Sequence, residues 1–386
     1  MKVLSIGSDK NLFKEDSAVR QRIIEYGSLA EELHIIVFSR QKSEIRNLKS
    51  ETNPKSQISK NTFIYSTNSW SRWFYILDAY KIAKRIILNS KFLIHNSLIT
   101  TQDPFECGLA GYIMAKKFKL PLHLQIHGDF LSPKFGQESF LNKIRVWLAK
   151  FLIPRADKIR VVSERIKDSI ISKFRSIDIS KIAVLPIFVD VKRIQKSDIK
   201  TNLHQKYPQL DPIILMASRL TKEKNIELAV EAMQEVIKFY PKTGLIIVGD
   251  GKEKNNLKFK IENLKLNENI IMESWIDDLS SYYKTADLFL LISNHEGWGM
   301  TSVEAMAAGC LLIMTDVGCA GEIVKNEYNG LVIPVGSKVK LIEAIERTIK
   351  EPSLHDKLKN NSLATVKNLA SKEEYLNSYK KSWEMR

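Results

Sequence analysis

The chain has 386 residues and a formal net charge of +15, and 44% of its residues are hydrophobic. This length predicts two domains that each bury a core, and the composition is that of a soluble protein. No apolar run reaches the roughly 18 residues of a membrane-spanning helix, and the first residues, MKVLSIGSDK, have too short an apolar stretch for a signal peptide. The three cysteines indicate neither a disulfide framework nor a zinc site, so we expect a cytoplasmic protein.

The excess positive charge lies in the first half of the chain. Residues 1–200 contain 35 Lys and Arg against 19 Asp and Glu, whereas the remaining residues contain 24 against 25. A basic half suits nucleic acid, an anionic membrane surface or phosphorylated substrates. Because the sequence contains no zinc-finger, RNP-type or helix-turn-helix signature, we do not expect a nucleic-acid partner.

Short apolar runs alternate with helical patterns through both halves of the chain. The runs are VLSIG (3–7), HIIVFS (34–39), LPLHLQIHG (120–128), KIRVVS (158–163), IILMAS (213–218), GLIIVGD (244–250), NIIMES (269–274), LFLLIS (288–293) and LLIMT (311–315). This alternation predicts parallel sheets with crossover helices, and hence two doubly wound α/β domains facing a cleft. No G-x-G-x-x-G follows the first run, which argues against a dehydrogenase.

Two strand ends in the first half offer candidate binding residues. Gly7 and Ser8 follow the first predicted strand and form a candidate backbone-lined rim. His127 ends the predicted strand 120–128, and Asp129 follows after the turn at Gly128. Ligands of open α/β sheets bind at the carboxyl ends of strands, which places His127 towards the cleft. A structural role is the alternative for this single histidine.

The segment SFLNKIRVWLAKFLIPR (139–155) combines an apolar stripe with flanking basic residues. The stripe consists of Phe140, Ile144, Trp147, Leu148 and Phe151, and the basic residues are Lys143, Arg145, Lys150 and Arg155. The stripe fits either a helix that faces the protein core or one that lies on an anionic membrane surface. In the second case Lys116, Lys117, Lys119 and the aromatic stretch WSRWFY (70–75) would extend the docking surface.

A polar segment without periodicity, KSDIKTNLHQKYPQ (196–209), separates the two halves. We therefore expect an N-terminal domain over residues 1–195 and a C-terminal domain over residues 196–370. The tail 371–386 places Tyr375, Tyr379 and Trp383 at four-residue spacing, which predicts a helix with one aromatic face. We expect this helix to pack back towards the N-terminal domain.

The first strand of the C-terminal half leads into SRLTKEKN (218–225). Arg219 and Lys224 lie here at a predicted strand-to-helix junction. An arginine fork and a lysine point charge together suit the neutralisation of a diphosphate. A solvated run of surface charges is the alternative for the same residues.

The stretch NHEGWGMTSVEAMAAGC (294–310) predicts a strand end, a Gly297-Trp298-Gly299 turn and a helix N-terminus. Thr301 and Glu304 match a T-x-x-E capping box. The glycines and the free N–H groups of a helix start suit phosphates or sugar hydroxyls. Glu296 and Glu304 then fit a nucleotide sugar, with one carboxylate for the transferred sugar and the other for the ribose. Helix capping is the alternative for Glu304.

Taken together, these segments resemble the retaining glycosyltransferases of family 4, which have the GT-B fold, over essentially the full chain. The resemblance is most specific at EGWGMTSVEAMAAGC, where Glu296 and Glu304 match the family's E-x7-E pattern. It extends to SRL…EKN, YYKTADLFLLIS, LIMTDVGCAGEIV, the HGDF turn and VLPIFVD. The chain departs from the family at Ser8, Ser218 and Ser274, where the family usually has glycine.

The resemblance implies that a nucleoside-diphosphate sugar binds the C-terminal domain and that the acceptor binds the N-terminal one. By position, Arg219 and Lys224 match the pair that stabilises the leaving diphosphate, Glu296 the carboxylate at the transferred sugar, Glu304 the carboxylate at the ribose, His127 the histidine near the reacting sugar, and Gly297, Trp298, Gly299, Met300 and Thr301 the donor-lining turn. Members of this kind need no bound metal or cofactor. The implied reaction retains the anomeric configuration, and the leaving phosphate helps to deprotonate the incoming hydroxyl.

The expected function is therefore transfer of a sugar to a saccharide or lipid-linked acceptor in the assembly of cell-surface polysaccharide or glycolipid. The basic N-terminal half suits an enzyme at the inner face of the cell membrane. Two alternatives remain at this point. One is a nucleotide-sugar epimerase on the same scaffold, and the other is a protein that binds a nucleotide sugar without turnover.

Overall fold

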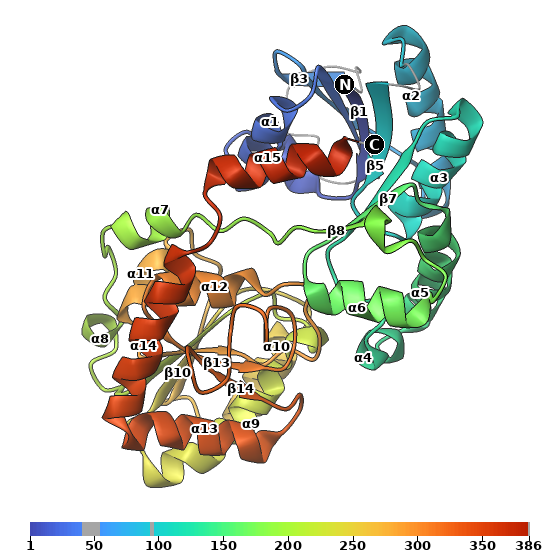
Figure 1. Cartoon of the computed structure of the whole chain (residues 1–386). Coiled ribbons are helices and arrows are strands. Elements are labelled where there is room, and N and C mark those ends of the chain that lie inside the picture. Colours follow the sequence, from blue (N-terminus) through green and yellow to red (C-terminus); the bar gives the residue numbers. More distant parts are fainter. Residues whose placement is uncertain (41–54, 93–95, 385–386) are drawn as a thin grey trace. The chain divides into compact units, whose positions relative to one another are not determined.

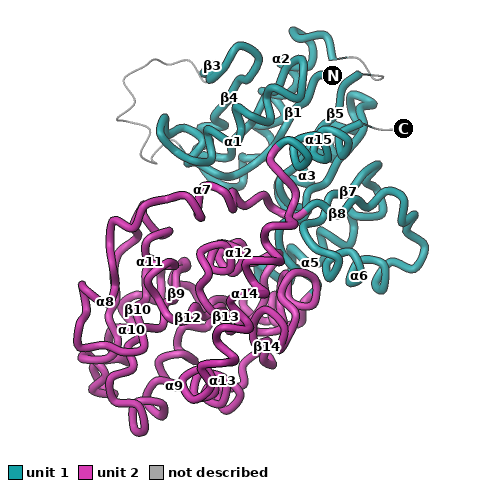
Figure 2. Tube along the Cα trace, turned by 60° about the vertical axis from the view of Figure 1, so that its left-hand side comes forward, with its two compact units in different colours: residues 1–131, 139–185, 373–386 teal, residues 132–138, 186–372 magenta. Residues whose placement is uncertain are grey.

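The computed structural model describes residues 1–40, 55–92 and 96–384 of the chain. The chain divides into two compact units, which Figure 2 colours separately. Unit 1 comprises residues 1–131, 139–185 and 373–386, and unit 2 comprises residues 132–138 and 186–372. Unit 1 is thus built from three separate segments, the last of which follows unit 2 in the sequence.

Unit 1 contains an eight-stranded sheet (Figure 1). Its strands are β1 (Lys2–Gly7), β2 (Glu32–Val37), β3 (Lys55–Ser59), β4 (Thr62–Ser66), β5 (Ser97–Thr101), β6 (Leu122–Ile126), β7 (Lys158–Val161) and β8 (Ile182–Val184). They lie in the order β3-β4-β2-β1-β5-β6-β7-β8. β3 pairs with β4 in an antiparallel manner, and the other pairs are parallel.

The helices of unit 1 cover both faces of this sheet. They are α1 (Ala18–Gly27), α2 (Tyr75–Asn89), α3 (Glu106–Phe118), α5 (Phe140–Leu152), α6 (Glu164–Lys173) and α15 (Lys372–Trp383). The connections from β4 to β5, β5 to β6 and β6 to β7 all step in one direction along the sheet. Because such crossovers are right-handed, α2, α3 and α5 lie on one face, and α1, whose crossover steps the other way, lies on the opposite face. Figure 1 shows this arrangement, with α15 beside α1.

Unit 2 contains a six-stranded, parallel sheet in the order β11-β10-β9-β12-β13-β14. Its strands are β9 (Ile213–Ala217), β10 (Gly244–Val248), β11 (Ile270–Glu273), β12 (Leu288–Leu291), β13 (Leu311–Thr315) and β14 (Leu331–Ile333). Its helices are α4 (Pro133–Gln137), α7 (Val191–Lys196), α8 (Leu203–Lys206), α9 (Ile226–Phe239), α10 (Lys254–Asn263), α11 (Leu279–Thr285), α12 (Met300–Ala307), α13 (Lys338–Lys350) and α14 (Pro352–Lys367).

Both sheets confirm the predicted α/β class. Every residue of β9, β10 and β13 is buried, as continuous apolar runs between two helical layers predict. The nine runs identified in the sequence all form strands. β3, β4, β5, β8 and β14 were not predicted, and they are short or contain Ser and Thr.

The strand order reverses once in each sheet. In unit 1 the reversal lies between β1 and β5, and in unit 2 it lies between β9 and β12. The crossover helices on the two sides of such a point lie on opposite faces, which opens a crevice at the carboxyl ends of the strands. These two edges are therefore the places to look for ligand-binding residues.

The C-terminal helix α15 packs on the unit 1 sheet through its aromatic face. The Tyr379 ring stacks on Tyr26, with ring centroids 4.2 Å apart, and its hydroxyl donates to Gln125 Oε1 at 3.1 Å. Arg160, buried on β7, places its guanidinium 4.8 Å from the Tyr379 ring centroid and donates to the same Gln125 oxygen at 2.8 Å. Trp383 is also buried. The last described helix therefore completes the polar core of unit 1.

Among the described residues, no helix combines the length and the hydrophobicity that crossing a bilayer would require.

Candidate active site

The reversal point of the unit 2 sheet brings two of the predicted residues into contact. Lys224 ends a short 3-10 helix after β9, and Glu296 follows β12. Lys224 Nζ lies 2.5 Å from Glu296 Oε1, and both side chains are largely shielded from solvent. The Ser293 hydroxyl donates to the same carboxylate oxygen at 2.7 Å. The Lys224 ammonium and the Glu296 carboxylate thus lie in contact at the edge of the sheet where a ligand is expected to bind.

The turn after Glu296 requires a glycine at position 299. Gly299 has a φ of +85°, in the left-handed region that favours glycine. The Trp298 side chain is buried, and its carbonyl accepts a hydrogen bond from the Cys319 N–H at 2.9 Å. Trp298 therefore offers a ligand only its backbone. Thr301, at the start of α12, lines the same small hollow as Ser218, Lys224 and Glu296.

The predicted capping box at Thr301 and Glu304 is wrong. α12 begins at Met300, Gly299 is the N-cap, and no side chain caps the helix. Ser302 instead donates to the Gly299 carbonyl at 2.6 Å. Because Gly299 already reverses the chain in a left-handed conformation, the helix begins before Thr301 can act as its cap. Glu304 therefore does not have the capping role that the sequence pattern suggested.

Glu304 lies one turn into α12, where it accepts a hydrogen bond from the Tyr283 hydroxyl at 3.1 Å. Burial raises the pKa of the Glu304 carboxyl above its ordinary value, although the Tyr283 hydrogen bond and the positive charge of Arg193 on α7 favour ionisation. A ligand that donates further hydrogen bonds to this buried carboxylate would stabilise its ionised form. Tyr283 and Arg193 were not identified from the sequence, because no local pattern links α7 and α11 to Glu304.

Arg219 is not part of the Lys224–Glu296 contact. Its side chain is 74% exposed, and Nη2 lies 3.2 Å from Glu223 Oε1. It follows β9 at the same edge of the sheet, so it is available to a ligand there only if it leaves Glu223. The structure therefore places Arg219 at this edge without bringing it together with the other predicted charges.

The reversal point of unit 1 groups three residues. Gly7 ends β1, Gln102 follows β5 and His127 follows β6, and these strands are neighbours. His127 Nε2 lies 3.2 Å from Gln102 Oε1, and a Cβ added at Gly7 would lie 3.2 Å from Gln102 Cγ. Ser8 is exposed beyond Gly7, and Asp129 is half-buried in the turn that precedes Phe130. Gln102 could not be recognised from the sequence, because the strand before it was not predicted.

Burial of the ring and the positive charge of Arg160 lower the pKa of His127 to about 3. The folded pKa lies below the unfolded value of about 6.5, so the unfolded chain binds the proton more readily. The neutral ring therefore contributes stability above about pH 6.5, and this contribution is lost as the pH falls towards 3. At neutral pH, His127 is an uncharged hydrogen-bonding group.

This lowered pKa leads to a pH prediction. Between pH 7.5 and pH 4.5, the His127→Gln variant should lose about 1–2 kcal/mol less of its free energy of unfolding than the wild type loses. Denaturant titrations at the two pH values measure the difference. His355→Gln, at a histidine of α14 in unit 2, is the control, and a pH dependence for His127→Gln equal to that of the wild type would contradict the assignment of a ring that stays neutral in the folded chain.

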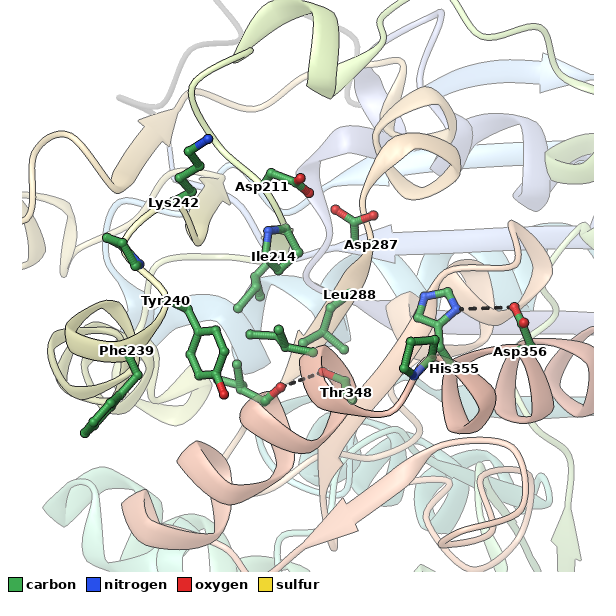
Figure 3. A pocket seen from close by; sticks show the side chains of 15 residues that line it. Asp211, Ile214, Phe239, Tyr240, Lys242, Asp287, Leu288, Thr348, His355 and Asp356 are labelled. Carbon is green, nitrogen blue, oxygen red and sulfur yellow. Dashed lines mark hydrogen bonds and ion pairs between the residues drawn. The ribbon is translucent and has the colours of Figure 1, made fainter.

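A larger cavity lies elsewhere in unit 2. Figure 3 shows this pocket of about 640 Å³, with Asp211, Tyr240, Asp287 and His355 among its lining residues. Asp211 precedes β9 and Asp287 precedes β12, so the pocket lies at the amino ends of the strands. His204, Asp211 and Asp287 bring potential metal-ligand atoms within 4.8 Å of one another. The Asp287 carboxylate already accepts from the Ile213 N–H and contacts His204, so this cluster has a structural explanation.

The sequence matches two family descriptions on successive parts of the chain. Residues 32–193 match "Glycosyltransferase Family 4", and residues 200–364 match "Glycosyl transferases group 1". Together the two matches cover most of the chain.

Curated relatives are similar over part of their length. An alpha-monoglucosyldiacylglycerol synthase of Streptococcus pneumoniae is 28% identical over 234 residues, which cover 56% of this chain and 51% of the relative. A UDP-Gal:alpha-D-GlcNAc-diphosphoundecaprenol alpha-1,3-galactosyltransferase of Escherichia coli is 27% identical over 263 residues, covering 66% of this chain and 67% of the relative. The aligned region thus spans about half to two thirds of these proteins.

A crystal structure of an Anabaena protein in complex with UDP and glucose has the same fold. It covers 99% of both chains with a TM-score of 0.76 and 18% sequence identity. This likeness shows the two Rossmann-like sheets of the GT-B fold. With the two family matches, it leads to the conclusion that the chain belongs to the glycosyltransferases of the family 4 type with the GT-B fold.

Proposed function

We propose that this glycosyltransferase moves a sugar from a nucleoside-diphosphate sugar to a hydroxyl of a saccharide or lipid-linked acceptor, with retention of the anomeric configuration and without a metal ion. The observation on which the proposal rests is the Lys224–Glu296 contact at the reversal point of the unit 2 sheet. Similarity to enzymes named for a diacylglycerol lipid and an undecaprenol-linked sugar supports an acceptor from cell-surface glycolipid or polysaccharide assembly.

In the proposed donor complex, the diphosphate lies between Lys224 and the N-terminus of α12. The ammonium and the free N–H groups of the helix favour the negative charge that develops as the bond from C1 of the sugar to the phosphate oxygen breaks. Arg219 leaves Glu223 to join them. The diphosphate would replace Glu296 as the partner of Lys224, which frees Glu296 to accept hydrogen bonds from hydroxyls of the transferred sugar.

Glu304 is proposed to bind the ribose hydroxyls. The acceptor is proposed to bind unit 1 near Gly7, Ser8 and Asp129. His127, neutral at working pH, would hydrogen-bond a hydroxyl there and would not act as a positive charge. The acceptor hydroxyl attacks C1 on the face that the diphosphate leaves, and its proton passes to the departing phosphate oxygen. No residue of the chain is then needed as general base.

The test is transfer by the purified full chain with a panel of nucleotide sugars and saccharide or lipid-linked acceptors. The proposal expects a glycoside whose anomeric proton, followed by NMR, has the same configuration as in the donor, and equal rates with and without a chelator. Conversion of the donor to an epimer in the absence of acceptor would make the protein an epimerase instead. Binding of nucleotide sugars with no turnover on any acceptor would leave a binding protein.

The Glu304→Gln variant should have opposite effects on the stability of the protein and on its affinity for the nucleotide. Because the folded pKa of Glu304 is raised, its contribution to stability is present below the unfolded pKa and is lost as the pH rises through the folded pKa. The uncharged glutamine escapes this loss, so the variant should gain stability relative to the wild type as the pH rises from about 4. Its affinity for the nucleoside diphosphate should fall by about 10- to 100-fold, because hydrogen bonds to a charged acceptor are lost.

Thermal melts at several pH values and calorimetric titration with UDP and other nucleoside diphosphates measure the two effects. Glu343→Gln, at an exposed glutamate of α13 paired with Lys340, is the control. Unchanged nucleotide affinity in Glu304→Gln would remove Glu304 from the donor site.

A further inference from the structure

Three neighbouring helices form one outer face of unit 1. α2, α3 and α5 lie on the same side of the sheet (Figure 1). The Tyr80 and Phe118 rings stack between α2 and α3, with centroids 6.2 Å apart, and Tyr112 meets Phe151 edge-on between α3 and α5. Because the inward sides of these helices cover the sheet, their outward side chains make one continuous surface, here named the α2-α3-α5 face.

Large apolar side chains point outward from this face. On α5 the buried positions are Asn142, Ala149 and Leu152, whereas Phe140 is 77% exposed and Trp147 is 67% exposed. The core-facing interpretation of the stripe is therefore wrong for Phe140, Ile144 and Trp147, and the sequence pattern did not reveal which side of the helix meets the sheet. The other exposed apolar residues of the three helices are Leu77, Leu88, Ile113 and Leu141, and Trp73 and Phe74 are exposed in the 3-10 helix that leads into α2.

The charges of the same three helices are almost all positive. The basic residues are Lys81, Lys84, Arg85, Lys116, Lys117, Lys143, Arg145 and Lys150, and the acidic ones are Asp78 and Glu106. Glu106 is paired with Arg145 at 3.0 Å, and Asp78 lies 3.7 Å from Lys81. A negatively charged partner would therefore meet little repulsion here. Exposed apolar groups among lysines are the combination that binds the headgroup region of an anionic bilayer.

Exposed aromatic residues lie where α2 and α5 begin. Trp70 and Trp73 lie between the carboxyl end of β4 and the start of α2, and Phe140 is the first residue of α5. Helices that follow parallel strands begin at the carboxyl edge of the sheet, so these aromatic rings lie at the edge that also holds Gly7 and His127. The lysines Lys116 and Lys117 lie at the other end, in the last turn of α3.

We propose that the α2-α3-α5 face and the adjoining residue Trp73 dock unit 1 on a bilayer containing anionic lipid, with the rings of Trp73, Phe140 and Trp147 entering the headgroup region and the lysines contacting lipid phosphates. This orientation would present the carboxyl edge of the unit 1 sheet to an acceptor embedded in the membrane. In this last respect the inference extends the proposed function, but docking itself requires neither donor nor turnover.

The experiment is sedimentation of the full chain with vesicles of phosphatidylglycerol and phosphatidylcholine, compared with vesicles of phosphatidylcholine alone. Binding should require phosphatidylglycerol and should weaken steeply with salt. Lys116→Gln combined with Lys117→Gln should lower the affinity by roughly fivefold for each charge removed. Phe140→Ala combined with Trp147→Ala should lower it further at every salt concentration, because the loss of apolar contact is not screened.

Matched controls come from unit 2. Lys357→Gln with Lys367→Gln removes two exposed lysines of α14, and Phe259→Ala removes a ring of α10 that is 65% exposed. These variants should bind vesicles as the wild type does. Equal loss in both sets would mean that the +15 charge acts non-specifically, and this would overturn the proposal.

Two further outcomes distinguish the alternatives. If sedimentation velocity shows a dimer that Trp147→Ala dissociates and vesicles are not bound, the face is an interface between two copies and the membrane proposal fails. If vesicles are bound through this face but no nucleotide sugar is turned over on any acceptor, docking is retained and the proposed function fails. Transfer to a soluble acceptor without any vesicle binding would instead support the proposed function and overturn docking.

Discussion

Replacing Lys224 by alanine is expected to lower kcat for sugar transfer by about 100- to 1000-fold. Lys224 provides the ammonium that meets the leaving diphosphate, and removing one preorganised group that stabilises developing charge has effects of this size. The Lys224 side chain is largely shielded from solvent, so water would only poorly replace the stabilisation that its positive charge provides. Steady-state kinetics with saturating donor and acceptor measure the change in kcat.

The loss must be separated from a loss of structure. In the Lys224→Ala variant, the Glu296 carboxylate would stay shielded from solvent but lose its positively charged partner. Combining Lys224→Ala with Glu296→Gln removes this unpaired charge, so the double variant should regain the wild-type melting temperature but not the turnover. Arg347→Ala, which removes an ion-paired cation from α13, is the control for charge alone. A Lys224→Ala enzyme with wild-type kcat would contradict the proposed donor site.

Replacing Tyr379 by alanine is expected to lower the free energy of unfolding of unit 1 by about 3–5 kcal/mol. Loss of a buried aromatic ring in a protein core has this cost. The ring also stacks on Tyr26 and covers the buried guanidinium of Arg160, so the cavity would border a charge. Denaturant unfolding followed by near-UV circular dichroism measures the effect.

Tyr379→Phe serves as the matched control, because it keeps the ring and removes only the hydroxyl that donates to Gln125. Its cost should be about 1 kcal/mol, the usual net value of one hydrogen bond. If Tyr379→Ala cost no more than Tyr379→Phe, then α15 would not be part of the unit 1 core.

Much of the fold could be predicted from apolar runs, and the failures have a physical cause. β9 and β10 are apolar throughout, so a strand buried on both faces is recognisable from its residues alone. β5 is equally buried but reads SLITT, and its Thr100 hydroxyl is paired with His123 and Gln125 on β6. Only the tertiary hydrogen bonds make such a polar strand stable in a core, and no local pattern reports them.

For the candidate site, the sequence predicts which strand ends carry charged and hydrogen-bonding residues. It does not predict which of these side chains contact one another. Lys224 and Glu296 are 72 positions apart, and their contact follows from the adjacency of β9 and β12 in the sheet. Arg219 follows the same strand as Lys224, but its exposed side chain is paired with Glu223, four residues further along the chain. Ser293 lay within a predicted strand end, so its contact with Glu296 could have been anticipated from their spacing of three residues.

The separation of unit 1 into three chain segments has a consequence during biosynthesis. Unit 2 ends at Lys372, so all its residues leave the ribosome before the aromatic residues of α15 do, and the nascent chain can complete unit 2 while unit 1 still lacks the aromatic rings around Arg160. A premature stop codon between residues 372 and 379 would therefore remove core residues of unit 1, most of which is encoded at the start of the gene. The same stop codon would leave every residue of unit 2 in place.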